Sequence, residues 1–170
     1  ETDPESQASK AVDAVSMFPH LFAQYMGDAP VIQQLVPLSQ IPRQCLDAVL
    51  SIEDPGFLEH QGISYKGLAR AMWVNLKSFK WAQGGSTITQ QLVKNYILTS
   101  EKNLSRKIRE VLLAYMVEWR IPKDQILETY LNIIYLGQQG NFQVRGYPAA
   151  ARFYCQKDIE NLEFHECALL

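Results

Sequence analysis

The chain has 170 residues, of which 47% are hydrophobic and 20% charged, a composition typical of one globular domain. A globule of this size buries roughly 70% of the surface of its unfolded chain, so it needs neither a disulfide nor a metal to fold. Apolar runs stay well short of the about 18 residues that a membrane span requires, and the first residues are polar and acidic. We therefore expect neither a spanning helix nor a secretory signal within this sequence.

The first part of the chain favours little regular structure. We expect residues 1–28 to be a lead-in or linker from a preceding segment, with one amphipathic stretch near 12–25. Residues 31–37 form the only strand that the pattern favours, and from there the periodicity is helical. This predicts a single, mainly α domain over 29–170. Because the sequence stops within an apolar helical pattern, we expect the domain to be incomplete at its C-terminal end.

Apolar spacing and end signals predict seven helices in this domain. Five of them are expected over 42–53, 87–98, 122 to a stop at Gly137, 148–154 and 162–170. For the other two the pattern gives a start, at 64 and at 105. Thr87 and Gln90 have the spacing of a capping box. The second helix is expected to place Leu68, Met72, Leu76 and Phe79 on one face, and the fourth to turn Ile108, Leu112, Tyr115 and Trp119 inward.

Charge is distributed unevenly along the sequence. Residues 1–59 carry a net charge of −7, residues 60–110 carry nine basic and two acidic side chains for a net +7, and residues 111–170 carry −2. A basic middle segment can concentrate an anionic ligand such as a phosphate, a nucleic acid or a lipid head group. The alternative is a set of solvated helix faces, and charge alone leaves both open.

The three cysteines are Cys45, Cys155 and Cys167, so the chain can form at most one internal disulfide. Cys155, His165 and Cys167 are one ligand short of a zinc site. We expect all three cysteines to be buried thiols that pack in the core.

Three segments contain residues suited to catalysis or binding. The first is 53–60, where Glu53 and Asp54 stand at the point where a helix breaks into a Pro-Gly turn. A carboxylate there can be partly desolvated and still face a cleft, as a general base must. The alternative is a helix-end acid beside a turn-forming Asp-Pro, with His60 a structural histidine.

The second segment, 83–95, leads from two glycines into a helix start whose free N–H groups would favour an anion, with Gln91 and Lys94 one to two turns on. It is otherwise a simple capped helix. The third is 106–110, in which Arg106 and Glu110 have the spacing of a surface ion pair. Glu110 also shares a stripe with Leu113 and Val117, which would place it in a cleft wall. Phosphate-loop, serine-hydrolase and zinc-protease motifs are absent from the sequence.

Five blocks of residues occur in the order found in one family. They are Glu53-Asp54-x-x-Phe57-x-x-His60-x-Gly62, the run from Gly84 to Asn95, Arg106-Lys107-x-x-Glu110, Lys123-x-x-Ile126-Leu127-x-x-Tyr130-Leu131-Asn132, and Arg145-Gly146-Tyr147-x-Ala149. The chain thus resembles, over about 29–170, the peptidoglycan glycosyltransferase domain of class A penicillin-binding proteins and monofunctional transglycosylases (family 51 glycosyltransferases). The spacing and the run 135–140 are most similar to the penicillin-binding protein 1B branch.

The resemblance implies a lysozyme-like α fold on the outer, periplasmic face of the bacterial inner membrane. It implies an enzyme that polymerises lipid II into β-1,4 glycan strands and releases undecaprenyl pyrophosphate. By position, Glu53 corresponds to the catalytic base and Glu110 to the second essential carboxylate. The implied substrate-binding residues are Asp54, Phe57, His60, Arg70, Ser86, Thr87, Gln90, Gln91, Lys94, Asn95, Lys102, Arg106 and Lys107.

The same resemblance implies further partners. A divalent metal, Mg or Mn, would sit on the pyrophosphate near Glu110, and a transpeptidase domain would belong to the same parent chain. No nucleic acid is expected as a partner. The residues Met72, Trp73, Leu76, Phe79 and Trp81, among Lys77 and Lys80, would face the bilayer, or else form ordinary helix core.

Two local departures from the family pattern stand out. Lys102 replaces an arginine, and Cys155-Gln156 replaces the usual Phe-Gly. Two other functions are consistent with a glutamate-bearing α domain: a lysozyme-like hydrolase with two carboxylates in acid and base roles, and a binding module without turnover. The basic segment and the presence of both Glu53 and Glu110 favour the transferase.

Overall fold

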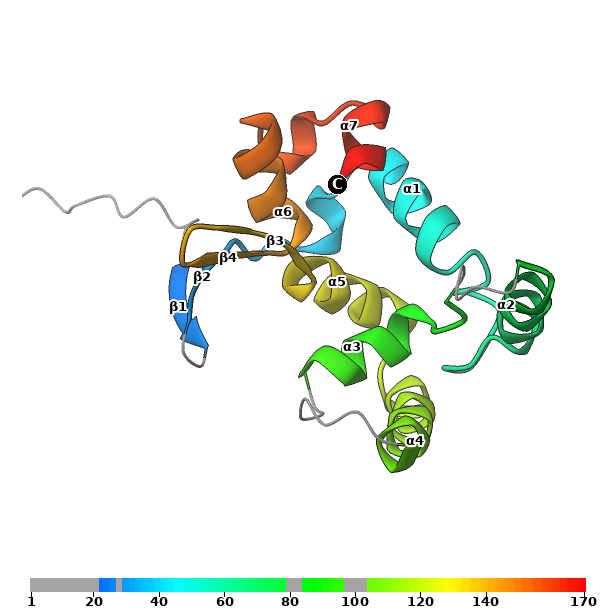
Figure 1. The fold of residues 1–170 in the computed structure, drawn as a ribbon. Helices are drawn as coiled ribbons and strands as arrows, with labels where there is room; N and C mark the ends of the chain where they lie inside the picture. Colours follow the sequence, from blue (N-terminus) through cyan, green and yellow to red (C-terminus); the bar gives the residue numbers. More distant parts are fainter. Residues whose placement is uncertain (1–21, 27–28, 79–83, 97–103) are drawn as a thin grey trace, which may run out of the picture.

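The computed structural model describes residues 22–26, 29–78, 84–96 and 104–170. Helices dominate, with one small sheet at the side of the helical body (Figure 1). The predicted mainly α class is confirmed. Most of the expected lead-in over 1–28 lies outside the described residues, and residues 22–26 of it form a strand.

The sheet has four strands in the order β1-β2-β4-β3. Strands β1 (Phe22–Met26) and β2 (Ala29–Gln33) are antiparallel, β2 is parallel to β4 (Phe142–Arg145), and β4 is antiparallel to β3 (Tyr135–Gln139). The expectation of a single strand was therefore wrong. Residues 135–145 carry glycines and glutamines in place of a β-branched run, so their strand character depends on pairing with β2, which sequence pattern does not show.

The predicted helices are present. They are α1 (Arg43–Glu53), α2 (Tyr65–Ser78), α3 (Ile88–Tyr96), α4 (Leu104–Arg120), α5 (Lys123–Ile133), α6 (Tyr147–Ala150) and α7 (Phe164–Leu169). Short turns of helix cover Leu38–Gln40, Ala151–Cys155 and Ile159–Asn161. Helix α5 ends at Ile133, before the expected stop at Gly137, because the following residues join the sheet. Residues 97–98, the expected end of the third helix, lie outside the described residues.

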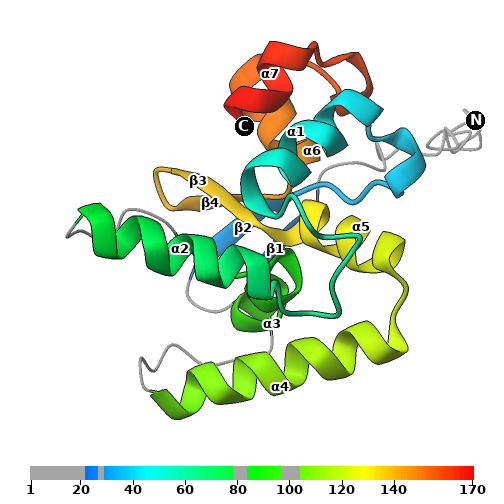
Figure 2. The ribbon, with the colours of Figure 1, turned by 90° about the vertical axis from the view of Figure 1, so that its right-hand side faces the viewer.

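The core forms where α1, α3, α5 and α7 meet (Figure 2). Its largest fully buried side chains include Tyr130, Phe57 and Ile126. Gly146 allows β4 and α6 to approach α5: its φ is +81°, and a Cβ there would stand 2.4 Å from the carbonyl oxygen of Asn132. Only glycine fits this position, which fixes the sheet against the helix that helps to support the site.

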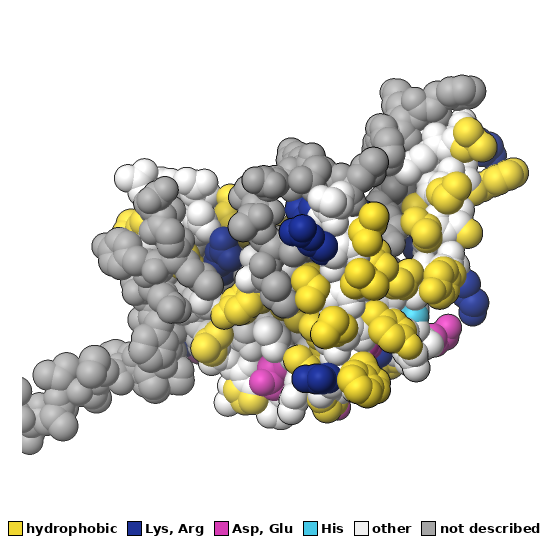
Figure 3. All heavy atoms as spheres, turned by 90° about the horizontal axis from the view of Figure 1, so that it is seen from below, with side chains coloured by type: hydrophobic (Ala, Val, Ile, Leu, Met, Phe, Trp, Pro, Cys, Tyr) yellow, Lys and Arg dark blue, Asp and Glu magenta, His cyan; other side chains and the backbone are white. Residues whose placement is uncertain are grey.

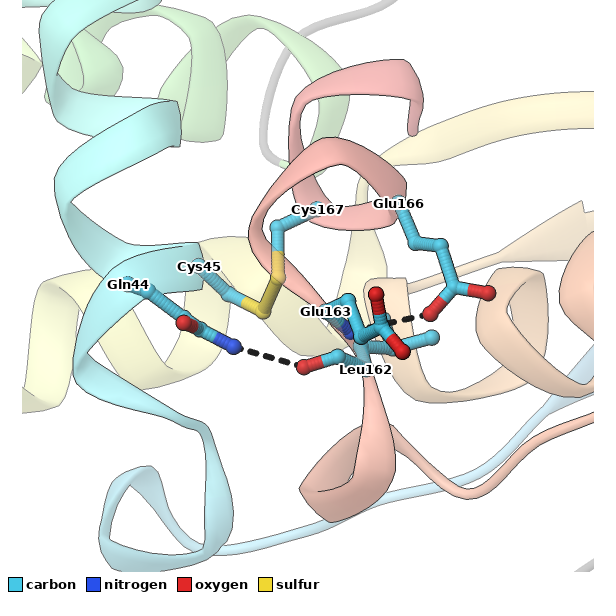
Figure 4. The surroundings of a disulfide bond; sticks show 6 residues. All are labelled: Gln44, Cys45, Leu162, Glu163, Glu166 and Cys167. Carbon is cyan, nitrogen blue, oxygen red and sulfur yellow. Dashed lines mark hydrogen bonds between the residues drawn. A yellow bond between two sulfur atoms is a disulfide. The ribbon is translucent and has the colours of Figure 1, made fainter.

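A disulfide joins Cys45 of α1 to Cys167 of α7 (Figure 4). The expectation of three free thiols was wrong for these two residues, whereas Cys155 is free and half-buried. The bonded cysteines are 122 residues apart in sequence, so no local sequence pattern predicts that they pair. Beside the disulfide, the Gln44 side chain donates to the Leu162 carbonyl oxygen at 2.6 Å. These contacts hold the two helices together.

The apolar faces of α2 and α4, which we call the outer helices, point outward. The side chains of Leu68, Met72 and Leu76 on α2 and of Ile108, Leu112, Tyr115 and Trp119 on α4 are between 47 and 78% exposed. The inward face predicted for α4 was therefore wrong. The face predicted for α2, for which both helix core and bilayer contact were open, is exposed, and Phe79 lies outside the described residues. Helix α4 buries Glu110 and Ala114, because this side packs on α3 and on Gly62. Figure 3 shows hydrophobic side chains gathered over this face of the molecule.

Candidate active site

A cavity of about 700 Å³ opens where α1 ends. Its walls come from the loop 54–64, the first turns of α2, the loop 84–87 and Tyr115 of α4. We call it the active-site cavity. Six of the predicted site residues line it: Glu53, Asp54, His60, Arg70, Ser86 and Thr87.

Glu53, the last residue of α1, presents an exposed carboxylate to this cavity. Gln91 of α3 donates from Nε2 to Glu53 Oε2 at 2.8 Å, and Tyr130 of α5 donates its hydroxyl to Gln91 Oε1 at 3.2 Å. Burial, and next the nearby Glu53 charge, raise the pKa of Tyr147 to about 12 and that of Tyr130 further above its usual range. Both phenols therefore stay neutral at neutral pH. The neutral Gln91 orients Glu53, and no cation of the described residues forms an ion pair with this carboxylate.

Asp54 is 4% exposed and has a different role from its neighbour. Its Oδ2 accepts hydrogen bonds from His60 Nε2 at 2.8 Å and from the backbone N–H of Ile88, at the start of α3, at 3.1 Å. The backbone N–H of Gly62 donates to His60 Nδ1 at 3.2 Å, so the ring carries its proton on Nε2 and is neutral. Asp54 thus ties the loop to the positive end of α3, so that of these two neighbours Glu53 is the carboxylate available to a ligand.

The predicted capping box is confirmed at the start of α3. The Thr87 N–H donates to Gln90 Oε1 at 3.0 Å, and the Gln90 N–H donates to Thr87 Oγ1 at 3.2 Å. The Thr87 hydroxyl donates in turn to the Gly62 carbonyl oxygen at 2.7 Å. Gly62 has a φ of +86°, and a Cβ there would come within 2.9 Å of the α4 backbone at Ala114. Both Thr87 and Gln90 are buried, so they shape the cavity through the loop.

Glu110 is 2% exposed and lies behind the cavity wall. Lys107 joins it to the cavity, because its Nζ donates to Glu110 Oε1 at 2.5 Å and to Ser86 Oγ at 3.0 Å. The sequence suggested a surface pair between Arg106 and Glu110, whereas the ion pair of Glu110 is with Lys107. The result is a buried acid that positions a half-exposed cation at the edge of the cavity.

The remaining predicted residues that the structure describes do not line the cavity. Phe57 is fully buried beneath the loop, with its ring 6.2 Å from that of His60. Lys94 and Asn95 are exposed on α3, one turn beyond Gln91, and Arg106 is half-buried on α4. Lys102 lies outside the described residues. The binding roles implied for these residues stay predictions.

Among the described residues, no three His, Cys, Asp or Glu side chains gather as a metal site would require. Glu110 already accepts from Lys107 and is almost fully enclosed. The described side chains therefore do not by themselves form a metal centre, and the predicted Mg or Mn stays a prediction.

Sequence reasoning missed part of the cavity. Glu59, Tyr65, Lys66 and Tyr115 also line it. Tyr65 and Lys66 lie three and four residues after the end of the first motif block at Gly62, and this proximity was the available signal. Tyr115 was expected to face the core, and no sequence signal indicates that α4 turns it toward the cavity.

An exposed carboxylate held by an amide, beside a cavity edged by Lys107 and Arg70, suits proton removal from a hydroxyl together with binding of an anionic group. The transglycosylase family model matches residues 20–170. The chain therefore belongs to the transglycosylase family, as the motif blocks predicted.

Individual relatives support this membership. The chain is 41% identical over 161 residues to penicillin-binding protein 1B of Haemophilus influenzae, covering 95% of this chain and 20% of the relative. It is 44% identical over 135 residues both to penicillin-binding protein 1B of Escherichia coli and to penicillin-binding protein 1A of Pseudomonas aeruginosa, covering 79% of this chain and 16% of each relative. The chain thus spans about a fifth of the length of these relatives.

Proposed function

We propose that the chain is a peptidoglycan glycosyltransferase that polymerises lipid II into β-1,4 glycan strands and releases undecaprenyl pyrophosphate. The observation that carries the proposal is the pairing of two groups at one cavity. The Glu53 carboxylate lines it, and Lys107, held by Glu110, reaches Ser86 on its wall. Membership of the transglycosylase family and the names of the relatives support the same activity.

In this proposal Glu53 is the general base. The acceptor is the 4-hydroxyl of a sugar, a weak nucleophile that needs a base within hydrogen-bond reach. Gln91 orients the carboxylate by donating to one of its oxygens, and the other oxygen remains for the acceptor hydroxyl. The hydroxyl attacks the anomeric carbon of the donor as its proton passes to Glu53, so the configuration at that carbon inverts.

The leaving pyrophosphate is a weak base, so it needs cations more than it needs a proton donor. Lys107 at Ser86 and Arg70 on the cavity wall provide positive charge there. Arg106, Lys94 and Lys102 belong to the same basic segment and would extend this field. A divalent metal on the pyrophosphate would add further charge neutralisation, and no step of the proposal depends on it.

We also propose that the outer helices contact the membrane that carries the lipid substrate. Trp73 and Leu76 of α2 are at least 70% exposed, and Lys66 and Lys77 flank them on the same helix. Apolar side chains beside basic ones suit an anionic lipid surface. Among the described residues, no helix is long and apolar enough to span a bilayer. The site of action would be the periplasmic face of the inner membrane, in a parent chain that also carries a transpeptidase domain.

The test is polymerisation of labelled lipid II with Mg²⁺ present, followed on a gel. The intact chain is expected to make glycan polymer, and Glu53→Gln is expected to lose about 10²–10⁴ in rate, as removal of a general base does. Glu59→Gln removes another carboxylate from the same cavity and is expected to keep most of the activity. If Glu53→Gln kept more than about a tenth of the rate, the base assignment would be wrong. If the chain cleaved finished glycan strands and made no polymer, the lysozyme-like hydrolase would be the correct function.

A further inference from the structure

A second cavity, of about 540 Å³, lies between the sheet and α5, and we call it the sheet-edge cavity. It shares no lining residue with the active-site cavity. Its walls come from four parts of the chain: β2 and the segment after it, the last residue of α3, the last turns of α5, and the end of β4. Three of the five motif blocks contribute no residue to the active-site cavity, and two of these three contribute a motif residue here, Asn132 and Arg145. The proposed function leaves both without a role.

Hydrogen bonds hold the walls of this cavity in place. The Asn132 side chain accepts from the Val36 N–H at 2.9 Å and donates to the Val36 carbonyl oxygen at 2.8 Å. Gln33 Nε2 donates to the Asn132 carbonyl oxygen at 2.7 Å, and Glu128 Oε2 accepts from the Leu38 N–H at 2.7 Å. The cavity is therefore preformed, as ligand sites usually are.

Arg145 is the cation of the sheet-edge cavity. It is half-buried, and both Nε and Nη2 donate to Gln143 Oε1, at 3.0 and 2.9 Å. Within the part of the chain that the structure describes, no carboxylate lies at ion-pair distance from it. By contrast, the half-buried Lys123 pairs with Glu118 at 2.7 Å. The fork of Arg145 is thus oriented, with donors remaining for a ligand oxygen.

Two further side chains at this cavity, together with Arg145, could bind a sugar. Tyr96 offers an aromatic face and is 59% exposed. Glu128 offers a carboxylate acceptor, with one of its oxygens already used by Leu38. Sugar rings present hydroxyl and acylamino groups at their edges and C–H groups on their faces. A flat aromatic ring beside a guanidinium and a carboxylate matches both kinds of surface.

Helix α3 connects the two cavities. Ser86 and Thr87, just before its start, line the active-site cavity, and Tyr96 at its end lines the sheet-edge cavity. The nine residues of α3 span about 13 Å at 1.5 Å per residue. Gln91, Lys94 and Asn95 have the i, i+3, i+4 spacing of one helix face and leave polar groups along this path.

We propose that the sheet-edge cavity binds a saccharide unit of the glycan strand, away from the bond made at Glu53. This inference rests on the proposed function and deepens it. A growing strand that occupies both cavities gains binding energy from a part of the substrate that does not react. Arg145 and Tyr96 are its binding residues in this second cavity.

The test compares binding of soluble peptidoglycan fragments of increasing length, followed by NMR titration on the chain. The intact chain is expected to bind a fragment long enough to reach both cavities more tightly than a disaccharide. Tyr96→Ala and Arg145→Gln are each expected to weaken binding of the long fragment about tenfold, the effect of losing about 1.4 kcal/mol, and to leave the disaccharide unchanged. Phe164→Ala on α7 and Arg43→Gln on α1 are matched controls at exposed positions that line neither cavity.

Polymer length on lipid II provides the second measurement, with the melting temperature as a check on folding. The two variants are expected to make shorter strands at an unchanged melting temperature. Unchanged binding of the long fragment, or equal loss for both fragments, would overturn the inference. Polymerisation by the intact chain with no effect of either variant refutes the subsite and leaves the proposed function standing. Tight length-dependent binding without polymer refutes the function and leaves the subsite standing.

Discussion

Helices α5 and α4 have similar apolar spacing in the sequence and opposite surroundings in the fold. Helix α5 buries Ile126, Tyr130 and Leu131, whereas α4 exposes Leu112 and Trp119 and buries the acid Glu110. The difference shows that periodicity predicts a helix and its faces, but not which face finds a partner. The outer helices α2 and α4 therefore leave apolar surface for a lipid or protein, while α1, α3, α5 and α7 form a core that holds Glu53.

The largest expected effect concerns the disulfide, which belongs to the core side of this comparison. Cys45 stands eight residues before Glu53 on α1, so the bond to α7 anchors the helix that carries the proposed base. Replacing both cysteines by serine is expected to lower the free energy of unfolding by about 2–5 kcal/mol, the usual effect of removing a native disulfide. Urea denaturation with and without a reductant measures this.

Cys155→Ser provides the control for the disulfide, because this thiol is free and half-buried. It is expected to cost about 1 kcal/mol or less. If a reductant left the free energy of unfolding of the intact chain unchanged, the disulfide would contribute nothing to stability. Side-chain packing alone would then distinguish the core helices from the outer helices.

A smaller effect is expected on the outer helices, and it should appear in lipid binding and not in folding. Trp73→Ser with Leu76→Ser removes two side chains that are at least 70% exposed. Stability is expected to change by less than about 0.5 kcal/mol for each, while binding to anionic phospholipid vesicles should fall about tenfold or more. Co-sedimentation with vesicles measures the second quantity.

Phe164→Ser with Leu169→Ser on α7 gives the matched control, since these apolar residues are also exposed but lie on the core side. Vesicle binding of this pair is expected to equal that of the intact chain. If both pairs lowered vesicle binding alike, exposure alone would explain the result, and the outer helices would have no special role.

The sequence predicted the helices well because their apolar spacing and caps are local properties. The Thr87–Gln90 box was predicted from its spacing, and the fold contains it. For Glu110 the spacing left a surface ion pair and a place in a cleft wall open, and the fold buries the side chain. Glu53 was singled out because it stands where a helix must break, and the structure places it on the wall of the active-site cavity. The disulfide, the strands β3 and β4 and the division of roles between Glu53 and Asp54 depend on residues brought together from far apart in sequence. No local pattern contains that information.

The smallest expected effect tests one of the two departures from the family pattern. Gln156, where the family usually has glycine, has a φ of +57°, and it is the only non-glycine residue with positive φ in the described chain. A side chain is disfavoured in this conformation, whereas glycine adopts it readily. Gln156→Gly is therefore expected to stabilise the fold by about 0.5–1 kcal/mol, even though glycine loses more entropy on folding. Gln138→Gly, at an exposed position without positive φ, should destabilise or leave stability unchanged. Thermal denaturation of the two variants measures this difference. A loss of stability in Gln156→Gly would mean that the glutamine side chain stabilises the core side through contacts that outweigh its backbone cost.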